Sequence, residues 1–335
     1  MGKIVGKQSI QFEEAPYIIE GASVVGQKEG DGPLGSLFDE VCADPMLGTE
    51  SWEEAESLLQ TKAVNKLLEK AAMTKEQIRY LFGGDLLGQL IATTFGIESF
   101  EIPFFGLYGA CSTMGEGISL AAMTVAAGYA DYVIALASSH FASAEKTFRF
   151  PLEYGNQRPY SATWTVTGSG AVLIGREKGI ARITGITTGK IMDYGVKDAQ
   201  NMGACMAPAA ADVLQQHFSD FGTTPDDYDK IITGDLGYVG QKILIDLLKD
   251  KGYDISRMHM DCGIEIFNAE KQDTHSGGSG CGCSATVLCG YILKELKKKK
   301  YKKILFIPTG ALMSPISFNE GQSVPGIAHL VRIEV

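Results

Sequence analysis

Short apolar runs alternate with longer amphipathic stretches along the chain, which is the pattern of a sheet covered by helices. Apolar residues recur at helical spacing after Ser51, a residue type that caps helix N-termini, and acidic residues fill the first turn. A short helix capped by Thr74 is also predicted at Lys75 to Ile78, and another helix is predicted from about Leu87 to Phe95. Buried strands are predicted at the apolar runs 17–26, 78–85, 132–138, 230–237 and 303–310. The chain is therefore predicted to be α/β, with parallel or mixed sheets.

The order of these elements is repeated once. The triplet Gly-Asp-Leu begins at Gly84 and again at Gly234, each time after an apolar run and before a helical pattern. The segment GACSTMGEGISLAAM (109–123) has a counterpart in GCGCSATVLCGYIL (280–293), and a predicted strand follows both. An internal repeat of this kind predicts two similar halves, packed around a pseudo-twofold axis with helices sandwiched between two sheets.

We divide the chain into an N-terminal half, residues 1–178, and a C-terminal half, residues 179–335. An insertion at about residues 140–165 links the halves and is rich in aromatic and basic side chains. Long insertions within a compact fold often carry function, so this segment is a candidate contributor to the site.

Composition excludes several classes of protein. The 335 residues carry a formal net charge of −10, whereas nucleic-acid binders are usually basic, so no nucleic-acid partner is expected. The start of the sequence has no apolar leader, and no run of about 18 apolar residues predicts a membrane span. Seven cysteines without a leader indicate reduced thiols in a cytoplasmic-type chain, and their spacing does not predict a metal site.

Cys111 is the strongest candidate for chemistry. It precedes a Gly/Ala-rich segment with apolar residues at helical spacing, so we expect the thiol at a helix N-terminus. Unpaired N–H groups and the helix dipole at that position would lower the pKa of the thiol and favour the nucleophilic thiolate. The alternative, equally open on spacing alone, is a buried cysteine that only packs.

The chain resembles the thiolase and ketoacyl synthase superfamily at several motifs in the same order. These motifs are Ala110-Cys111-Ser112 with the helix after it, TGSGAVLIG (167–175), HSGGSG (275–280) and TGALMSP (309–315). The resemblance spans nearly the whole chain and implies a thiolase-like duplicated fold with helices sandwiched between mixed five-stranded sheets. It also implies that Cys111 matches the nucleophile and His275 a catalytic histidine.

Within that superfamily, the N-terminal stretch 17–41, the GACSTMGEG segment and the end of the chain resemble the stage V sporulation protein AD family. Members of that family are implicated in moving dipicolinic acid (pyridine-2,6-dicarboxylate), with calcium, into the developing bacterial spore. The resemblance therefore implies a peripheral protein at the spore inner membrane, with other membrane proteins of the same sporulation operon as partners. Superfamily enzymes are generally dimers, so it also implies a homodimer.

The catalytic set of a condensing enzyme is incomplete in this chain. Elongating synthases carry another histidine after the second-half strand, where this chain reads Thr233-Gly234-Asp235. Thiolases begin the C-terminal Gly-rich turn with a cysteine, where this chain reads Pro308-Thr309-Gly310. Catalytic groups act as a unit, so a missing partner costs orders of magnitude in rate. We therefore expect a retained pocket rather than condensation, with no cofactor; calcium bound together with the ligand stays open.

A pocket for a flat dianion needs cationic or N–H donors for the carboxylates and apolar walls for the ring. The candidate ligand-binding residues are Cys111, His140, Lys146, Arg149, Arg158 and His275. Each has a structural alternative, because a histidine at a strand end is often internally hydrogen-bonded and an arginine often forms a surface salt bridge. Asp85 and Asp235, at equivalent places in the repeat, are expected to cap helices.

Two functions follow from different features. The missing catalytic partner favours a dipicolinic-acid-binding protein, whereas Cys111 with His275 favours an acyltransferase or condensing enzyme acting on thioesters. The lysine-rich run Lys297–Lys303 is read either as a solvated helix end or as a contact with anionic lipid.

Overall fold

The computed structural model describes residues 2–148 and 157–335. Its strands are β1 (Gly2–Val5), β2 (Ser9–Phe12), β3 (Tyr17–Gly26), β4 (Glu40–Cys42), β5 (Tyr80–Gly84), β6 (Phe104–Gly106), β7 (Tyr132–Ser139), β8 (Trp164–Thr165), β9 (Gly168–Gly175), β10 (Ala181–Thr187), β11 (Lys230–Thr233), β12 (His259–Asp261), β13 (Gly278–Ser279), β14 (Lys303–Ile307), β15 (Thr309–Ala311), β16 (Gly326–Ala328) and β17 (Leu330–Glu334). Its α-helices are α1 (Gln27–Gly30), α2 (Trp52–Ala71), α3 (Ile91–Ile97), α4 (Thr113–Ala126), α5 (Phe141–Phe148), α6 (Met202–Phe221), α7 (Gly237–Lys249), α8 (Cys262–Ile266), α9 (Ala269–Gln272), α10 (Cys281–Val287), α11 (Leu293–Lys297) and α12 (Pro315–Asn319).

The two halves have the same strand order. The first half runs β6-β5-β7-β9-β3 and the second runs β12-β11-β14-β17-β10. In both, the first three strands are parallel and the fourth is antiparallel to its neighbours. The predicted duplicated architecture is confirmed, and the predicted division after residue 178 falls between β9 and β10.

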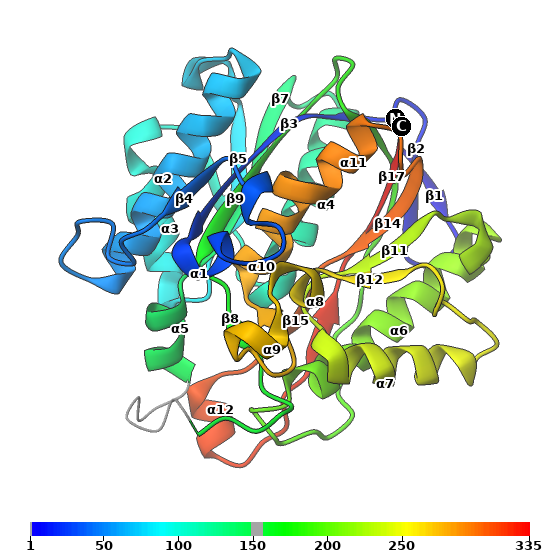
Figure 1. Cartoon of the computed structure of the whole chain (residues 1–335). Coiled ribbons are helices and arrows are strands. Elements are labelled where there is room, and N and C mark those ends of the chain that lie inside the picture. Colours follow the sequence, from blue (N-terminus) through cyan, green and yellow to red (C-terminus); the bar gives the residue numbers. More distant parts are fainter. Residues whose placement is uncertain (1, 149–156) are drawn as a thin grey trace.

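The predicted five-stranded sheets are present as two runs of strands, but the exact strand count is not confirmed, because the two runs are joined. A two-residue antiparallel pairing, Arg182 with Tyr17 and Ala181 with Ile18, joins β10 to β3. Strands β1, β2 and β4 add to this arrangement, which makes a 13-stranded sheet; in the described residues β13 pairs with β8 and β15 with β16 in two small separate sheets. This short pairing joins the two five-stranded runs, which face each other across the central helices (Figure 1).

Three buried hydrophobic clusters fill the layers. The central cluster packs α4, α10 and α11 between the two runs of strands, with Ile118 and Val287 among its members. Helices α2 and α3 cover the outer face of the first run through residues such as Leu59 and Leu67. Helices α6 and α7 cover the outer face of the second run, where Leu214 and Leu244 are fully buried (Figure 1).

Local signals explain where these helices begin and end. Ser51 accepts a hydrogen bond from the N–H of Glu54 and caps α2, as predicted. Thr74 and Gln77 form a reciprocal capping box around a short 3-10 helix, Lys75–Gln77, which confirms the predicted cap. The helix after Cys111 begins as a 3-10 turn at Ala110–Ser112 and continues as α4. Its N-terminus therefore lies at Cys111, where the sequence predicted it.

No helix in the described ranges is both long enough and apolar enough to cross a membrane.

Candidate functional site

A cavity of about 380 Å³ lies beyond the carboxyl end of β5, between segments of the two halves. Open α/β sheets place their ligand sites outside this end of the parallel strands. The walls come from segments far apart in the sequence, and most of the lining side chains are apolar. The lining residues are Leu86, Gly88, Tyr108, Ala110, Cys111, Ala144, Glu145, Thr147, Phe148, Thr165, Met202, Ser279, Gly280, Ala311, Leu312, Met313, Ser314 and Pro315.

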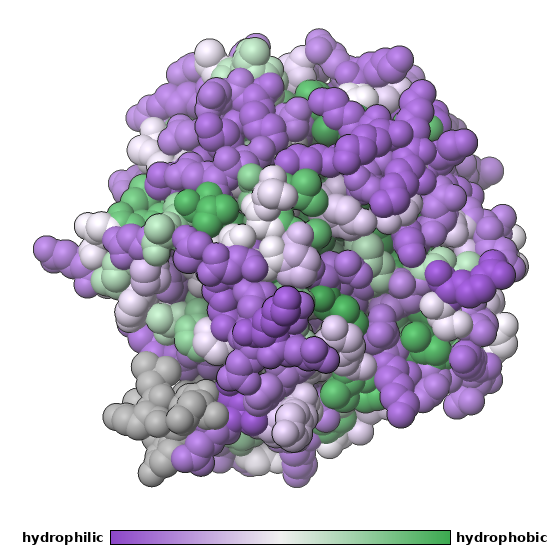
Figure 2. Space-filling model, viewed as in Figure 1, coloured by the Kyte–Doolittle hydropathy of each residue, from purple (hydrophilic) through white to green (hydrophobic). Residues whose placement is uncertain are grey.

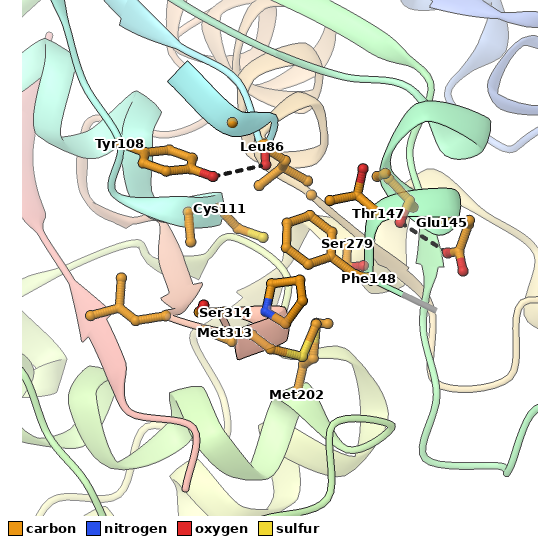
Figure 3. A pocket seen from close by; sticks show the side chains of 18 residues that line it. Leu86, Tyr108, Cys111, Glu145, Thr147, Phe148, Met202, Ser279, Met313 and Ser314 are labelled. Atoms are coloured by element: carbon orange, nitrogen blue, oxygen red, sulfur yellow. Dashed lines mark hydrogen bonds between the residues drawn. The ribbon is translucent and has the colours of Figure 1, made fainter. Parts of the chain in front are cut away.

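Cys111 and Phe148 face each other across this cavity, with Met202 and Met313 on the side below them (Figure 3). The hydroxyl of Tyr108 donates to the carbonyl of Leu86 at 3.4 Å, which ties two parts of the wall together. On the far side, the hydroxyl of Thr165 donates to the Glu145 carboxylate at 3.2 Å. The described lining residues include no lysine, arginine or histidine, so Glu145 is the ionisable group besides the Cys111 thiol and Tyr108.

The backbone at Cys111 is strained. Ala110 has φ 51°, in the left-handed region that costs a non-glycine residue about 1 kcal/mol or more. The small side chains around it allow a close approach of the second half: the Cys281 thiol donates to the Ala110 carbonyl at 2.9 Å. A strained backbone beside a cavity residue is common at functional sites, because the surrounding structure holds it.

Asp235 is the direct partner of the Cys111 thiol. Its carboxylate accepts hydrogen bonds from Cys111, from the Thr309 hydroxyl at 2.8 Å and from the Gly280 N–H at 3.1 Å. Burial raises the pKa of Asp235 to about 7, while the hydrogen bonds from Cys111 and Thr309 hold it down. Asp235 was expected to cap a helix; instead it bridges Cys111 to the start of α10.

The expected lowering of the Cys111 pKa is wrong. Burial raises the pKa of this thiol well above its usual value, and the neighbouring Asp235 carboxyl raises it further. The dipole of a helix N-terminus is a modest effect, whereas complete burial shifts a pKa by several units. At neutral pH Cys111 is therefore a neutral thiol that donates to a carboxyl group.

Of the other predicted residues, His140, Lys146, Arg158 and His275 are not among the described residues that line the cavity beside Cys111. His140 is buried. Its ring centroid lies 5.4 Å from that of Trp52, and its Nε2 is hydrogen-bonded to the Pro45 carbonyl at 2.9 Å. Burial lowers the pKa of His140, as expected for a neutral internal ring. Lys146 forms an ion pair with Glu53 at 2.5 Å and points away from the cavity that its neighbours Glu145 and Thr147 line.

Arg158 and His275 form a second group, centred on Asp273. The Arg158 guanidinium donates to the Asp273 carboxylate at 3.0 Å, and His275 contacts the same side chain at 3.1 Å. Arg158 also lies over the Trp164 ring at 4.9 Å, and the second ring nitrogen of His275 bonds the Pro159 carbonyl. Among the described lining residues of the cavity neither appears, so the predicted catalytic role of His275 has no geometric support beside Cys111. Arg149 lies outside the described residues.

Sequence reasoning missed most of the cavity wall. Phe148 is in the predicted insertion, and Met313 is in the TGALMSP motif, but nothing in either segment indicated that its side chain faces Cys111. Asp235 did have a signal, because it stands where elongating synthases carry a histidine. That position, rather than the HSGGSG loop, supplies the ionisable partner of the thiol.

Solved structures with the same arrangement match this chain at low sequence identity. The 3-oxoacyl-[acyl-carrier-protein] synthase III of Aquifex aeolicus VF5 matches with a TM-score of 0.59 at 14% identity, covering 96% of this chain and 100% of that chain. Cerulenin-bound OleA of Xanthomonas campestris matches with a TM-score of 0.55 at 14% identity, covering 98% of each chain. At this identity the likeness shows the fold alone, and it confirms the predicted thiolase-like class.

Sequence comparison is more specific. The family model of Stage V sporulation protein AD matches residues 6–334. The stage V sporulation protein AD of Bacillus subtilis (strain 168) is 45% identical over 332 residues, which cover 99% of this chain and 98% of that protein. The chain therefore belongs to the stage V sporulation protein AD family.

Proposed function

We propose that the cavity beside Cys111 is a binding site for a small molecule, and that this molecule is dipicolinic acid taken up during sporulation. The observation that carries the proposal is a cavity of about 380 Å³ with largely apolar walls in a chain of this family. A volume of this size and walls of Phe148, Met202 and Met313 suit a single small aromatic ring.

The charge of the cavity constrains how a dicarboxylate binds. Among the described lining residues there is no cationic side chain, and Glu145 adds an acidic one. A bare dianion would lose its hydration without a counter-charge, which is costly in an apolar site. A calcium ion bound with the ligand would make the chelate neutral, and Glu145 offers the hard oxygen ligand that calcium prefers. The ligand roles of Arg149, His140, Lys146, Arg158 and His275 stay predictions.

Calorimetric titration tests this function. We expect pyridine-2,6-dicarboxylate to bind and the 3,5-isomer to bind at least tenfold more weakly, because only the former chelates through the ring nitrogen. Repeating the titration with excess calcium and with a chelator separates the two parts of the proposal. Equal affinity in both would remove calcium from it, and equal binding of the two isomers would overturn the ligand.

A cavity-blocking variant locates the site. Gly88 lines the cavity, has no left-handed φ and has open space where a Cβ would lie, so Gly88→Trp adds bulk without a backbone clash. We expect this variant to lose binding at least tenfold. Ala127→Trp adds the same side chain on the exposed end of α4 and is the matched control. Unchanged binding by Gly88→Trp would place the ligand elsewhere.

A second function is favoured by one observation, the hydrogen bond between Cys111 and Asp235 beside a strained Ala110. Asp235 is placed to accept the thiol proton if Cys111 attacks a thioester, which would release the free thiol of coenzyme A and leave an acyl group on Cys111. Intact-mass measurement with several acyl-coenzyme A donors tests this, with Cys111→Ser as the control. A mass gain on Cys111 would favour acyl transfer over simple binding.

Assembly and location form the last part of the proposal. Strand β6 ends the described sheet, its three residues are exposed, and Glu116 is the one charged residue between 102 and 130. An uncharged open strand edge suits antiparallel pairing with a second copy. We expect a dimer by analytical ultracentrifugation, monomers for Phe105→Asp, and a dimer for Ile4→Asp on exposed β1. Attachment to the spore inner membrane through Lys297–Lys303, alongside membrane proteins of the same operon, completes the proposal.

A further inference from the structure

The loop between β5 and α3 holds two consecutive strained residues. Gln89 has φ 55° and Leu90 has φ 54°. Neither is a glycine, so each residue carries the steric penalty of the left-handed region. Two such residues in succession are unusual, and they interrupt the helix that the sequence predicted from residue 87.

One buried carboxylate fixes both ends of this loop. Asp85 accepts hydrogen bonds from the Leu87 N–H at 2.7 Å, from the Thr93 N–H at 2.8 Å and from the Thr93 hydroxyl at 2.5 Å. The Thr93 oxygen also accepts from the side chain of Gln60 on α2 at 2.9 Å. The ends of the loop are therefore anchored, and the backbone strain is confined to Gln89 and Leu90.

The second half of the repeat provides an internal comparison. After the second Gly-Asp-Leu triplet, the Asp261 carboxylate accepts from the Leu236 N–H at 2.9 Å and from the Gly237 N–H at 3.0 Å. The left-handed residue there is Gly237, with φ 63°, which adopts this conformation at no steric cost. In the Gly-Asp-Leu repeat Gly237 corresponds to Leu87, and residues 238–249 continue α7 with ordinary φ values, so the second half has no counterpart of the strained pair Gln89 and Leu90.

The Leu90 side chain fills a small recess beside two glycines, Gly84 and Gly106, and we call this recess its seat. Its side chain is 8% exposed although the two residues before it are exposed. A Cβ added at Gly106 would lie 2.7 Å from a Leu90 methyl group, and one added at Gly84 would lie 3.3 Å away. The missing side chains at 84 and 106 therefore leave the space that Leu90 fills, and this burial offsets the strained backbone.

We propose that residues 86–91 are a gate of the cavity, with Leu90 as its latch. Leu86 and Gly88 form part of the cavity wall, so a movement of this loop changes access to Cys111. The structure shows the closed state, in which Leu90 is seated. In the open state Gln89 and Leu90 return to ordinary φ values and Leu90 leaves its seat, while Asp85 keeps both ends in place. The gate rests on the cavity but not on the identity of its ligand.

The modification rate of Cys111 by methyl methanethiosulfonate, read by peptide mass, measures opening without any ligand. Gln89→Gly removes the penalty of the closed state, so we expect the rate to fall about fivefold. Gln89→Ala removes the same exposed side chain but keeps the penalty, and its rate should match the wild type. Leu90→Ala empties the seat, and its rate should rise at least fivefold.

A loop with only a structural role would not lower the Cys111 modification rate in Gln89→Gly and raise it in Leu90→Ala. Equal rates for Gln89→Gly and Gln89→Ala would overturn the gate, as would a Leu90→Ala rate equal to the wild type. Circular dichroism melting excludes general unfolding of Leu90→Ala as the cause of a faster rate. The series is repeated in the Phe105→Asp background, so that cover of the loop by a second copy does not decide the result. Failure of dipicolinate to bind would leave this test unaffected.

Discussion

Cys111 shows how burial overrides a local electrostatic effect. The thiol lies at the start of a helix, as its sequence neighbours predicted, and yet its pKa is raised. The loss of water around a fully buried sulfur disfavours the thiolate more than the helix terminus favours it. A carboxyl group as hydrogen-bond partner adds to this, because a thiolate beside Asp235 would bring two negative charges together.

Replacing Asp235 by asparagine tests that explanation. Removing the carboxyl charge should lower the pKa of Cys111, so the pH at which the thiol becomes reactive should move down in Asp235→Asn. The measurement is the pH dependence of Cys111 modification by methyl methanethiosulfonate. Thr309→Val removes one hydrogen bond to Asp235 but keeps its charge, so this control should not lower the midpoint. A midpoint for Asp235→Asn at or above that of the wild type would contradict the explanation.

Glu29 is a second buried carboxyl group and predicts a pH dependence of stability. Burial raises its pKa to about 7 from 4.5, and one carboxyl oxygen accepts from the Thr167 N–H at 3.0 Å. Since the pKa is higher in the folded state, its contribution to stability is present below pH 4.5 and is lost as pH rises towards 7. The full loss is on the order of 3 kcal/mol at 1.36 kcal/mol per unit.

The variant Glu29→Gln cannot ionise, so the corresponding slope in the free energy of unfolding between pH 4.5 and 8 should disappear. Urea denaturation across this range measures the slope. Glu50→Gln changes an exposed glutamate and should keep the wild-type pH dependence. The same slope in Glu29→Gln and in the wild type would show that Glu29 does not titrate in this range.

At the scale of helices and strands, the sequence signals whose predictions are confirmed are local ones. Ser51 and Thr74 mark helix starts because a side chain caps its own helix, so the sequence around them carries the information. The helix predicted at 87–95 instead begins at Ile91, because Gln89 and Leu90 are left-handed. Gly88 precedes the turn, but neither of the two left-handed residues is a glycine, and the contacts that hold them come from Asp85 and from the seat at Gly106.

The candidate site was predictable only in part, because only some of its residues have a local sequence signal. The position of Cys111 was predictable because the residues that follow it have the spacing of a helix. Phe148, Met202 and Met313 meet it because three distant segments converge, and no local pattern records such a convergence. His140 was chosen as a titratable side chain and His275 because it lies in the HSGGSG motif, and the structure shows each with partners from its own surroundings.

The central helices predict opposite effects for two glycines. A Cβ at Gly282 in α10 would lie 2.4 Å from the Gly168 carbonyl oxygen, which is fixed in β9. We expect Gly282→Ala to lower the free energy of unfolding by about 2 kcal/mol or more, as overpacked cores do. At Gly117 in α4 the nearest atom would be 3.4 Å away, an ordinary contact. Gly117→Ala should therefore be neutral or stabilising by up to about 1 kcal/mol. Urea denaturation measures both, and similar losses in the two variants would refute this packing argument.

At the scale of the whole molecule, the cavity and the lysine-rich run lie at opposite ends. The run follows α11, near the two chain termini, whereas the cavity lies among β15, α5 and α12 (Figure 1). The surface where α11 ends is hydrophilic (Figure 2). A membrane contact at the lysine run would therefore leave the cavity facing away from the lipid, and the two functions are separable by mutation.

The lysine run is already partly neutralised, which decides how it should be tested. Lys298 and Lys300 pair with Glu295 at 3.0 and 2.6 Å, and in the described residues no ion pair involves Lys297, Lys299 or Lys302. Each unpaired lysine near an anionic surface contributes roughly 1 kcal/mol. Changing these three to glutamine should therefore weaken binding to phosphatidylglycerol vesicles by about a hundredfold at low salt, in a sedimentation assay.

The control changes Lys242, Lys249 and Lys251 around α7, and it should bind as the wild type does. An equal loss in both triple variants would show that net charge, rather than this surface, drives the contact. Because the cavity lies at the other end, ligand affinity should be the same with and without vesicles.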